Sequence, residues 1–406
     1  MATADKYDRQ LRLWGANGQA ALMSAHVLLV NAGPTGTETL KNLVLPGVGR
    51  FTVLDGATVT ESDLGNNFFV EADSVGRPRA DVVTELLCEM NPDVKGTALV
   101  ADLEEYDNEA FVSQFSIVVA SQLGEAPLLR LADTCWRRGV PLLACRSFGL
   151  VGHVRLAVRQ HDVVESKPDA SVPDLRLSRP WPELAAHCAE TDLAALDSMG
   201  HAHVPCVVIL VQLARRWRDA HGGAAPATAD ERQQFRESVR AAARDFDNEI
   251  NFQEAYADAW KAFAAPNLPA EAAALLAEAS ACTVGPDTPP FWVLLRAVHE
   301  FMNSADGDAV GDNGGGSSGG ADAGLPPLKG EVPDMAADTD RFVRLQEVYR
   351  SKAQADRAAV AARAKALLAA AGRSADDIPT EETDRFCRNV ANLRSLRTRS
   401  LAQERA

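Results

Sequence analysis

The sequence contains no long apolar run, no closely spaced cysteine pair and no surplus of basic residues, and each absence excludes a class of protein. A membrane-spanning helix needs about 18 or more consecutive apolar residues, and no such run occurs. The N-terminal stretch MATADKYDRQLRLWG has no apolar signal core, so no signal peptide is expected.

The cysteine and charge content points away from metal sites and from nucleic acid. The seven cysteines are scattered without a C-x-x-C pair, so neither a zinc site nor a disulfide framework is indicated. A reducing, intracellular compartment is the simplest interpretation. The 56 acidic and 41 basic residues give a formal net charge of -15, which argues against nucleic acid as a partner. The remaining composition is ordinary for a soluble globular protein of two or three domains.

The first 165 or so residues alternate short apolar runs with helical patterns. Strands are predicted at residues 26–33, 50–56, 115–122, 140–149 and 151–158. Helices are predicted between them at residues 37–47, 79–92 and 128–139. Alternating strands and helices with apolar strands predict an α/β fold, in which a mainly parallel sheet is covered on both faces.

From about residue 166 to 406 the pattern becomes mostly helical. Helices are predicted at residues 208–217, 230–263, 291–302 and 339–371. Residues 305–324 are rich in glycine and lack apolar anchors, which predicts a flexible loop. We therefore expect two domains, residues 1–165 and 166–406.

The stretch VLLVNAGPTGTETLKNLVL has the form of a nucleotide site, a strand followed by a glycine loop and a helix. Gly33 and Gly36 match the second and third glycines of G-x-G-x-x-G, but Asn31 stands at the first. Pro34 removes one N–H donor from the phosphate cradle. Asp55 lies where an acid would bind a ribose hydroxyl. These residues are compatible with two interpretations: a nucleotide site, or a turn that only packs the helix on the sheet.

Several segments resemble the N-terminal half of ubiquitin-like-protein activating enzymes, which have a Rossmann-like, ThiF-type adenylation fold. These segments are KYDRQLRLWG, LKNLVLPGVG, VLDGATVTESDLGNNFF and VGRPRADV. Other segments resemble the regulatory, non-catalytic subunits of the heterodimeric activating enzymes of the neddylation pathway: CRSFGLVGHVR, VVESKPD, DLRLSRPWPEL, HAHVPCVVIL and GEVPDMAADTDRFVRLQEVYRSKAQAD. The resemblance implies a pseudo-adenylation domain over residues 1–165. It also implies a catalytic-cysteine-like domain over residues 166–406.

The resemblance also implies that the chain has no activity of its own. Active members adenylate the modifier with ATP and magnesium, and then pass it to a cysteine. Where they carry Asn-Arg-Gln, this sequence has residues 65–67, Gly-Asn-Asn. Active members carry a magnesium-binding Asp, but residues 120–127 contain no Asp. At a separate position where active members carry a basic residue, Arg79 keeps the charge. We expect no cofactor in the chain alone, with ATP and magnesium held by the catalytic partner. The alternatives are a self-sufficient adenylyltransferase and an NAD-dependent enzyme.

No cysteine is indicated as a transferring nucleophile. Cys206 opens an apolar helix and is expected to pack in a core or an interface. Cys282, in SACTVGP, lacks the surroundings that such a thiol needs. The other cysteines, in helix or strand patterns, are expected to behave as small hydrophobic residues.

The resemblance gives Arg9 a role outside its own domain. In the family, the N-terminal helix of one adenylation half reaches the ATP site of the other, where the matching arginine contacts the phosphates. A solvated arginine is the ordinary alternative. The expected partners are the catalytic subunit, the ubiquitin-like modifier and, indirectly, the conjugating enzyme, in the cytoplasm and nucleus. The residues expected to meet the catalytic subunit are Cys206, Val332, Pro333, Asp334, Met335, Asp338, Phe342 and Leu345.

Family members continue past the position that matches RSLAQERA, and their last segment returns to the adenylation domain. We expect that return segment to be absent here, with apolar surface exposed where it would pack.

Overall fold

The computed structural model describes residues 6–166, 173–264, 268–303 and 324–405. The chain forms two compact units, one made of Met1–His161 with Ser395–Ala406 and the other of Asp162–Arg394. The first boundary therefore lies near the expected residue 165. The end of the chain belongs to the first unit. The glycine-rich loop expected at residues 305–324 lies almost wholly outside the described residues.

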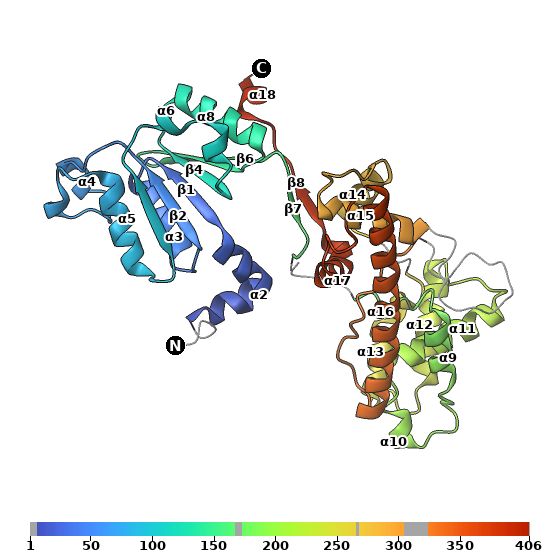
Figure 1. The fold of residues 1–406 in the computed structure, drawn as a ribbon. Helices are drawn as coiled ribbons and strands as arrows, with labels where there is room; N and C mark the ends of the chain where they lie inside the picture. The colour runs from blue at the N-terminus through green and yellow to red at the C-terminus, as the bar shows by residue number, and fades with distance from the viewer. Residues whose placement is uncertain (1–5, 167–172, 265–267, 304–323, 406) are drawn as a thin grey trace. The chain divides into compact units, whose positions relative to one another are not determined.

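The first unit is built on a six-stranded sheet in the order β3-β2-β1-β4-β5-β6 (Figure 1). Its strands are β1 (His26–Val30), β2 (Arg50–Leu54), β3 (Lys95–Leu99), β4 (Ile117–Ser121), β5 (Leu142–Phe148) and β6 (Val151–Ala157). Strands β1 to β5 pair in parallel, and β6 pairs antiparallel with β5. The predicted mainly parallel sheet is confirmed. We did not predict β3, because its half-exposed residues make no continuous apolar run.

Alternating side chains of β1 serve two cores, one on each face of the sheet. Val27 and Leu29 join the cluster that α3 (Pro34–Val44) and α5 (Arg79–Met90) complete. Leu28 and Val30 join the cluster under α8 (Glu125–Arg138). The shorter elements are α4 (Glu61–Leu64), η1 (Ala72–Ser74), α6 (Leu103–Tyr106) and α7 (Glu109–Val112). Burial on both faces explains why residues 27–30 of β1 are all apolar.

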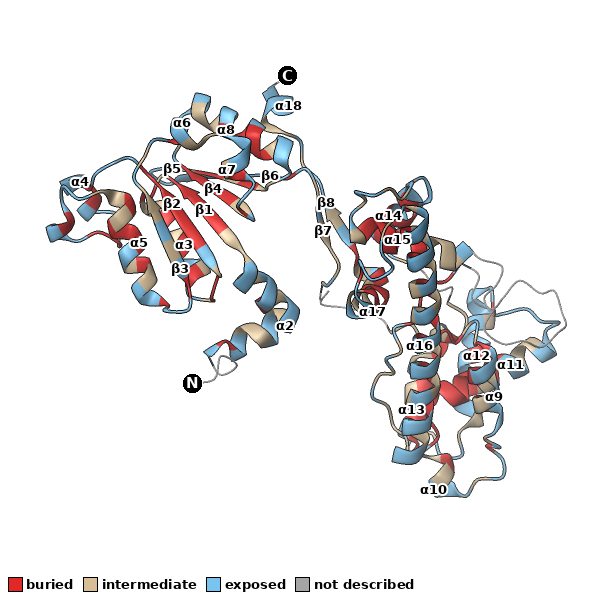
Figure 2. Ribbon diagram, in the orientation of Figure 1, coloured by how far each residue is buried: buried red, intermediate tan, exposed pale blue. Residues whose placement is uncertain are grey.

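The second unit is helical and has two cores, both of which contact one long helix, α16 (Thr339–Ala370). Buried residues recur along α16 at about every fourth position, so one side of the helix packs over its whole length (Figure 2). Its first half packs against α9 (Pro182–Ala189) and joins the core to which α11 (Cys206–Ala220) also contributes, and its second half packs against α15 (Pro290–Asn303). The other helices are α10 (Ser198–His201), α12 (Ala229–Ala242), α13 (Ile250–Ala257), η2 (Ala259–Ala262), α14 (Ala270–Ser280), α17 (Thr380–Asn389) and η3 (Val390–Asn392).

The single helix predicted at residues 230–263 is broken into α12, α13 and η2. The break falls where the Glu249 carboxylate accepts hydrogen bonds from the backbone N–H groups of Arg244 and Asp245. Such a side-chain acceptor replaces the helical bonds of those groups. No helix in the described part of the chain is long and apolar enough to cross a membrane.

The last residues of the chain, Ser395–Ala406, belong to the first unit. Thr398 bonds to Val158, and Glu404 of α18 (Leu401–Arg405) forms an ion pair with Arg155. A two-stranded sheet, β7 (His161–Val163) and β8 (Arg394–Leu396), lies where the chain passes between the units. The hairpin of β5 and β6 exposes apolar side chains, including Leu150 and Val154.

Candidate functional site

The turn between β1 and α3 is shaped by close backbone packing. Asn31 has φ 68°, a conformation that asparagine tolerates better than most residues, and its Nδ2 donates to Ser121 O at 2.9 Å. A Cβ at Gly36 would lie 2.8 Å from a Leu29 methyl carbon and 2.9 Å from Asn31 O. Pro34 occupies the first turn of α3 and offers no N–H. Packing of the helix on the sheet therefore accounts for Gly36 without a ligand.

Asp55, which would be the ribose-binding acid of a nucleotide site, is occupied by groups of its own chain. One carboxylate oxygen accepts from Ala32 N at 2.8 Å and from Arg79 Nε at 2.8 Å, and the other accepts from Ala57 N at 2.9 Å. The side chains of Asp55 and Arg79 are 5% and 15% exposed. This buried ion pair joins the end of β2 to the start of α5.

Arg79 extends the ion pair into a cluster of four side chains, Asn31, Asp55, Asp63 and Arg79. Its Nη1 donates to Asp63 Oδ1 at 3.2 Å and its Nη2 to Asn31 Oδ1 at 2.8 Å. Burial alone would lower the pKa of Arg79. The carboxylates of Asp55 and Asp63 outweigh this effect, so the pKa of Arg79 is raised above its ordinary value. Each of the three guanidinium nitrogens therefore donates a hydrogen bond to a member of the cluster.

Asp63 serves the cluster and also caps α4. Its carboxylate accepts from the Thr60 N–H at 2.8 Å and from the Thr60 hydroxyl at 2.7 Å. Burial alone would raise the pKa of Asp63, but the Thr60 hydrogen bonds and the Arg79 charge hold it below its ordinary value. Sequence analysis missed Asp63, although T-x-x-D is a local capping-box signal. What the sequence could not give is the contact with Arg79.

Two other places where the sequence departs from active family members, residues 65–67 and the turn after β4, are also held by hydrogen bonds within the unit. Asn67 is buried, donates to Ala32 O at 3.1 Å and accepts from the Thr37 hydroxyl at 3.2 Å. In the Asp-free turn after β4, the Gln122 side chain donates to Ser147 O at 2.7 Å and accepts from Ser147 N at 2.8 Å. The bonds of these side chains tie loops of the unit to one another.

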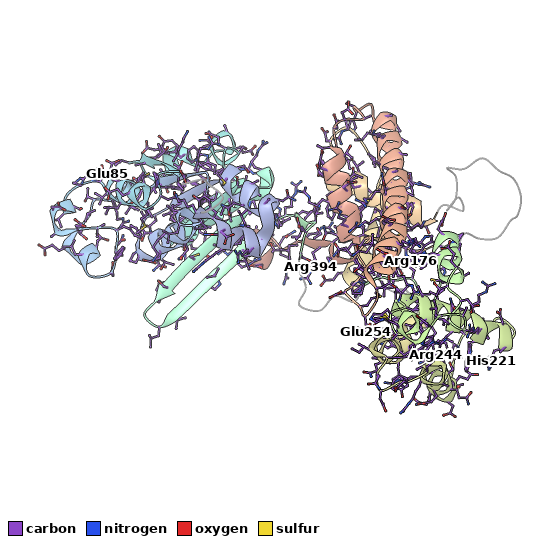
Figure 3. All side chains as sticks on the ribbon, turned by 90° about the horizontal axis from the view of Figure 1, so that it is seen from below. Glu85, Arg176, His221, Arg244, Glu254 and Arg394 are labelled. Carbon is purple, nitrogen blue, oxygen red and sulfur yellow. The ribbon has the colours of Figure 1, made fainter. Side chains whose placement is uncertain are left out.

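Taken as a phosphate and metal site, these residues fit poorly. The cradle lacks the N–H of Pro34, and the nearest cation, Arg79, is neutralised by two carboxylates. The neighbouring Arg77 pairs with Glu85 on the surface, where Glu85 is labelled in Figure 3. A triphosphate needs unengaged positive charge and free N–H donors. The arrangement therefore favours the structural interpretation of the turn.

The helix that carries Arg9, α2 (Asp8–Ser24), is anchored along one face. Tyr7, just before it, is buried; its hydroxyl donates to Asp93 at 3.1 Å and accepts from Asn91 at 3.1 Å. Trp14 donates to Gln19 at 3.0 Å. The helix bends at Gly15, where φ is 74°.

Arg9 lies on the opposite, exposed face of α2 and forms no ion pair or hydrogen bond with any described residue. Arg12, three positions along, pairs with Asp8 of the same helix. Leu13, one turn beyond Arg9, is 68% exposed. This face therefore presents a free guanidinium beside an apolar side chain, a combination suited to a partner surface.

The buried cysteines include several thiols that burial makes less acidic. Burial raises the pKa of the Cys206 thiol to about 12, and its sulfur lies 3.7 Å from the sulfur of Met335. Burial likewise raises the pKa values of Cys135, Cys188 and Cys387 to about 12. A transferring cysteine needs the opposite, an accessible thiol with a lowered pKa.

The residues expected at the partner interface divide by burial. Leu345 and Cys206 are buried in the core of the helical unit. Asp338 caps α16 by accepting from Arg341 N. Asp334 is exposed, and the other four are half-buried: Val332, Pro333, Met335 and Phe342. A contact with a partner remains a prediction for the accessible residues.

We expect iodoacetamide at pH 8 to leave Cys206 unmodified in the folded chain. With a pKa of about 12, roughly one thiol in 10⁴ would be ionised at that pH, and burial blocks access to it. The half-buried Cys88 and Cys282 should react first. Peptide mapping by mass spectrometry measures each site, with the urea-unfolded chain as the fully labelled control. Labelling of Cys206 as fast as Cys282 would contradict the burial argument.

Comparison with known proteins places this arrangement in a family. The model of the ThiF family matches residues 7–291. The NEDD8-activating enzyme E1 regulatory subunit of Xenopus laevis is 41% identical over 406 residues, which cover 98% of this chain and 73% of that protein. The chain belongs to this family of regulatory subunits. The AXR1 regulatory subunit of Arabidopsis thaliana is 40% identical over 403 residues, covering 98% of this chain and 71% of that protein.

Among solved structures, one match is E. coli MccB with AMPCPP and MccA. The alignment covers 39% of this chain and 49% of the MccB chain, with 17% identity and a TM-score of 0.34. That likeness is too low to support an argument. The ThiF match begins at Tyr7 and so includes Arg9, the loop from Asn31 to Gly36 and the Asp55–Arg79 pair. The sequence resemblance to the regulatory subunits of neddylation is thereby confirmed over nearly the whole chain.

Proposed function

We propose that this chain pairs with the catalytic subunit of a NEDD8-activating enzyme and acts upstream of cullin modification. The observation that carries the proposal is the 41% identity over 98% of the chain to a protein named as the regulatory subunit of that enzyme. Both units take part in the match, so the role belongs to the chain as a whole. We propose the cytoplasm and nucleus as the compartments in which this step takes place.

We propose further that the chain binds no nucleotide and forms no thioester by itself. Support comes from Asp55 and Arg79, which engage each other in the nucleotide-type turn, and from the buried, weakly acidic thiol of Cys206. ATP, magnesium and the reactive cysteine belong to the catalytic partner. The helical unit then helps to position the ubiquitin-like modifier, and the conjugating enzyme acts afterwards.

Within the complex, Arg9 completes the partner's ATP site. An arginine contributed in trans supplies positive charge to phosphates that are already bound elsewhere. Arg9 meets the structural requirement, because it is exposed and has no partner among the described residues of its own chain. Tyr7, through Asp93, and Gln19, through Pro46 O, hold the helix from the other side, so the guanidinium starts from a rigid base.

Reconstitution tests this function. The chain mixed with the catalytic subunit should co-elute in gel filtration and charge the modifier as a thioester, whereas neither subunit alone should do so. Titration calorimetry of the isolated chain should detect no micromolar binding of magnesium-ATP or of NAD. Binding of magnesium-ATP by the isolated chain would support a self-sufficient adenylyltransferase, and binding of NAD a dehydrogenase. Full activity of the catalytic subunit alone would contradict the proposal.

A further inference from the structure

Three arginines on α12 each lie over an aromatic ring, and we name them the arginine ladder: Arg232, Arg236 and Arg240. Their guanidinium carbons lie 5.6 Å, 4.1 Å and 5.0 Å from the ring centroids of Phe263, Tyr256 and Phe246 respectively. All three arginines are exposed, and the rings beneath them are half-buried. The ladder lies wholly within the helical unit, on a surface that the proposed chemistry does not use.

The ladder has a regular geometry set by the helix. Residues four apart lie on one face of an α-helix, about 6 Å apart along its axis. The opposite face of α12 is buried through Phe235 and Val239, so the helix cannot rotate. A cation–π contact with a ring restricts the motion of a guanidinium and leaves its N–H groups available. The three side chains therefore form a row of pre-oriented, fork-shaped donors.

The ladder is not neutralised within the described residues, even though acids outnumber bases in the chain. None of the three arginines forms an ion pair there, and Arg236 makes only a backbone bond, to Tyr256 O at 3.2 Å. Nearby acids have other partners: Glu231 accepts from Thr228 N, and Glu237 accepts from the Tyr256 hydroxyl. In an acidic protein, unpaired arginines held in fixed orientations point to a ligand that carries negative charge.

We propose that the arginine ladder binds an extended acidic segment of a partner protein. Alternate side chains of an extended strand repeat every ~6.6 Å, which matches the ~6 Å spacing of the ladder. Each carboxylate then receives the two parallel N–H bonds that arginine favours. A net charge of -15 disfavours a long polyanion such as RNA, which would feel the field of the whole molecule. This contact is additional to the proposed pairing with the catalytic subunit and does not depend on it.

Fluorescence anisotropy of the full chain tests the proposal with a labelled peptide that has glutamate at every second position. The wild-type chain should bind this peptide at least ~10-fold more tightly than the matching glutamine peptide, because only carboxylates accept charge-assisted bonds. The triple variant Arg232→Gln, Arg236→Gln, Arg240→Gln should lose at least ~10-fold in affinity. The triple lysine variant, which keeps the charge but loses the fork and the stacking, should lose several-fold.

A matched control removes the same charge elsewhere on the helical unit, with Arg344→Gln, Arg350→Gln and Arg388→Gln, all at exposed positions. This control should bind the glutamate peptide like the wild type. Circular dichroism melts verify that each variant is folded. If the control loses as much affinity for the glutamate peptide as the triple glutamine variant, net charge alone explains the effect and the proposal is overturned. It would also be overturned if the wild type fails to bind the glutamate peptide, or binds an oligouridylate more tightly.

Discussion

Replacing Arg9 with alanine is expected to slow adenylate formation by the reconstituted heterodimer by roughly 10²- to 10³-fold. Arginines supplied in trans to nucleotide phosphates typically have effects of this size or larger, because they stabilise charge that develops as the phosphate reacts. Arg9 is exposed and unpaired among the described residues, so its loss leaves no buried group unsatisfied. ATP–pyrophosphate exchange measures this step separately from thioester transfer.

The same helix supplies the control. Arg12→Ala removes an equally exposed guanidinium that already pairs with Asp8, and it should change the exchange rate less than about twofold. Arg9→Lys should recover part of the rate, because it restores charge without the planar fork. Gel filtration must show that Arg9→Ala still forms the heterodimer. Wild-type exchange rates for Arg9→Ala, at both low and saturating ATP, would rule out the trans contact.

The fold of the first unit could be predicted from local signals. Continuous apolar runs such as 26–30 and 117–121 identified strands buried on both faces, and glycine or proline marked most helix ends. The signal failed at β3, an edge strand whose side chains are only partly buried. It also failed between α12 and α13, where the Glu249 side chain takes backbone bonds that a helix would otherwise use. Both failures arise from tertiary contacts that local periodicity does not contain.

The candidate site was predicted in part, and for a related reason. The sequence showed that the loop had lost a glycine and gained Pro34, but it left two interpretations open. The decisive contact joins Arg79 to Asp55 and Asp63, which are 24 and 16 positions away. Spacing along a chain does not report such proximity, which depends on how β2, α4 and α5 converge. An apolar pattern also does not separate core residues such as Leu345 from surface residues.

The second large effect expected is on stability: Arg79→Ala should destabilise the first unit by about 3 kcal/mol. The change leaves Asp55 and Asp63 with no cation, and these carboxylates are only 5% and 12% exposed. Breaking a buried ion pair by removing one partner is costly, since the remaining charge loses its compensation without regaining water. Calorimetry of the full chain should show the transition of this unit lowered by roughly 6–12 °C.

Arg77, two positions earlier, is the matched control. It pairs with Glu85 at 2.7 Å, but these side chains are 47% and 57% exposed. Arg77→Ala should therefore destabilise the unit far less than Arg79→Ala does, because exposed ion pairs contribute little to stability. If Arg79→Ala and Arg77→Ala destabilise the unit equally, the buried cluster does not hold the turn as we argue. Arg79→Lys should fall between them, because lysine cannot bridge Asn31, Asp55 and Asp63 together.

The pH dependence of unfolding measures how much the negative charge of Asp63 contributes to stability. The pKa of Asp63 is held below its ordinary value in the folded chain, so the folded state binds a proton less readily than the unfolded state. Its contribution to stability is therefore present above the ordinary aspartate pKa of about 4 and is lost as the pH falls through the lower folded-state value. Asp63→Asn removes this contribution, so denaturant unfolding should depend less steeply on pH between about 5 and 3. An unchanged pH slope in that variant would show that Arg79 is compensated by Asp55 alone.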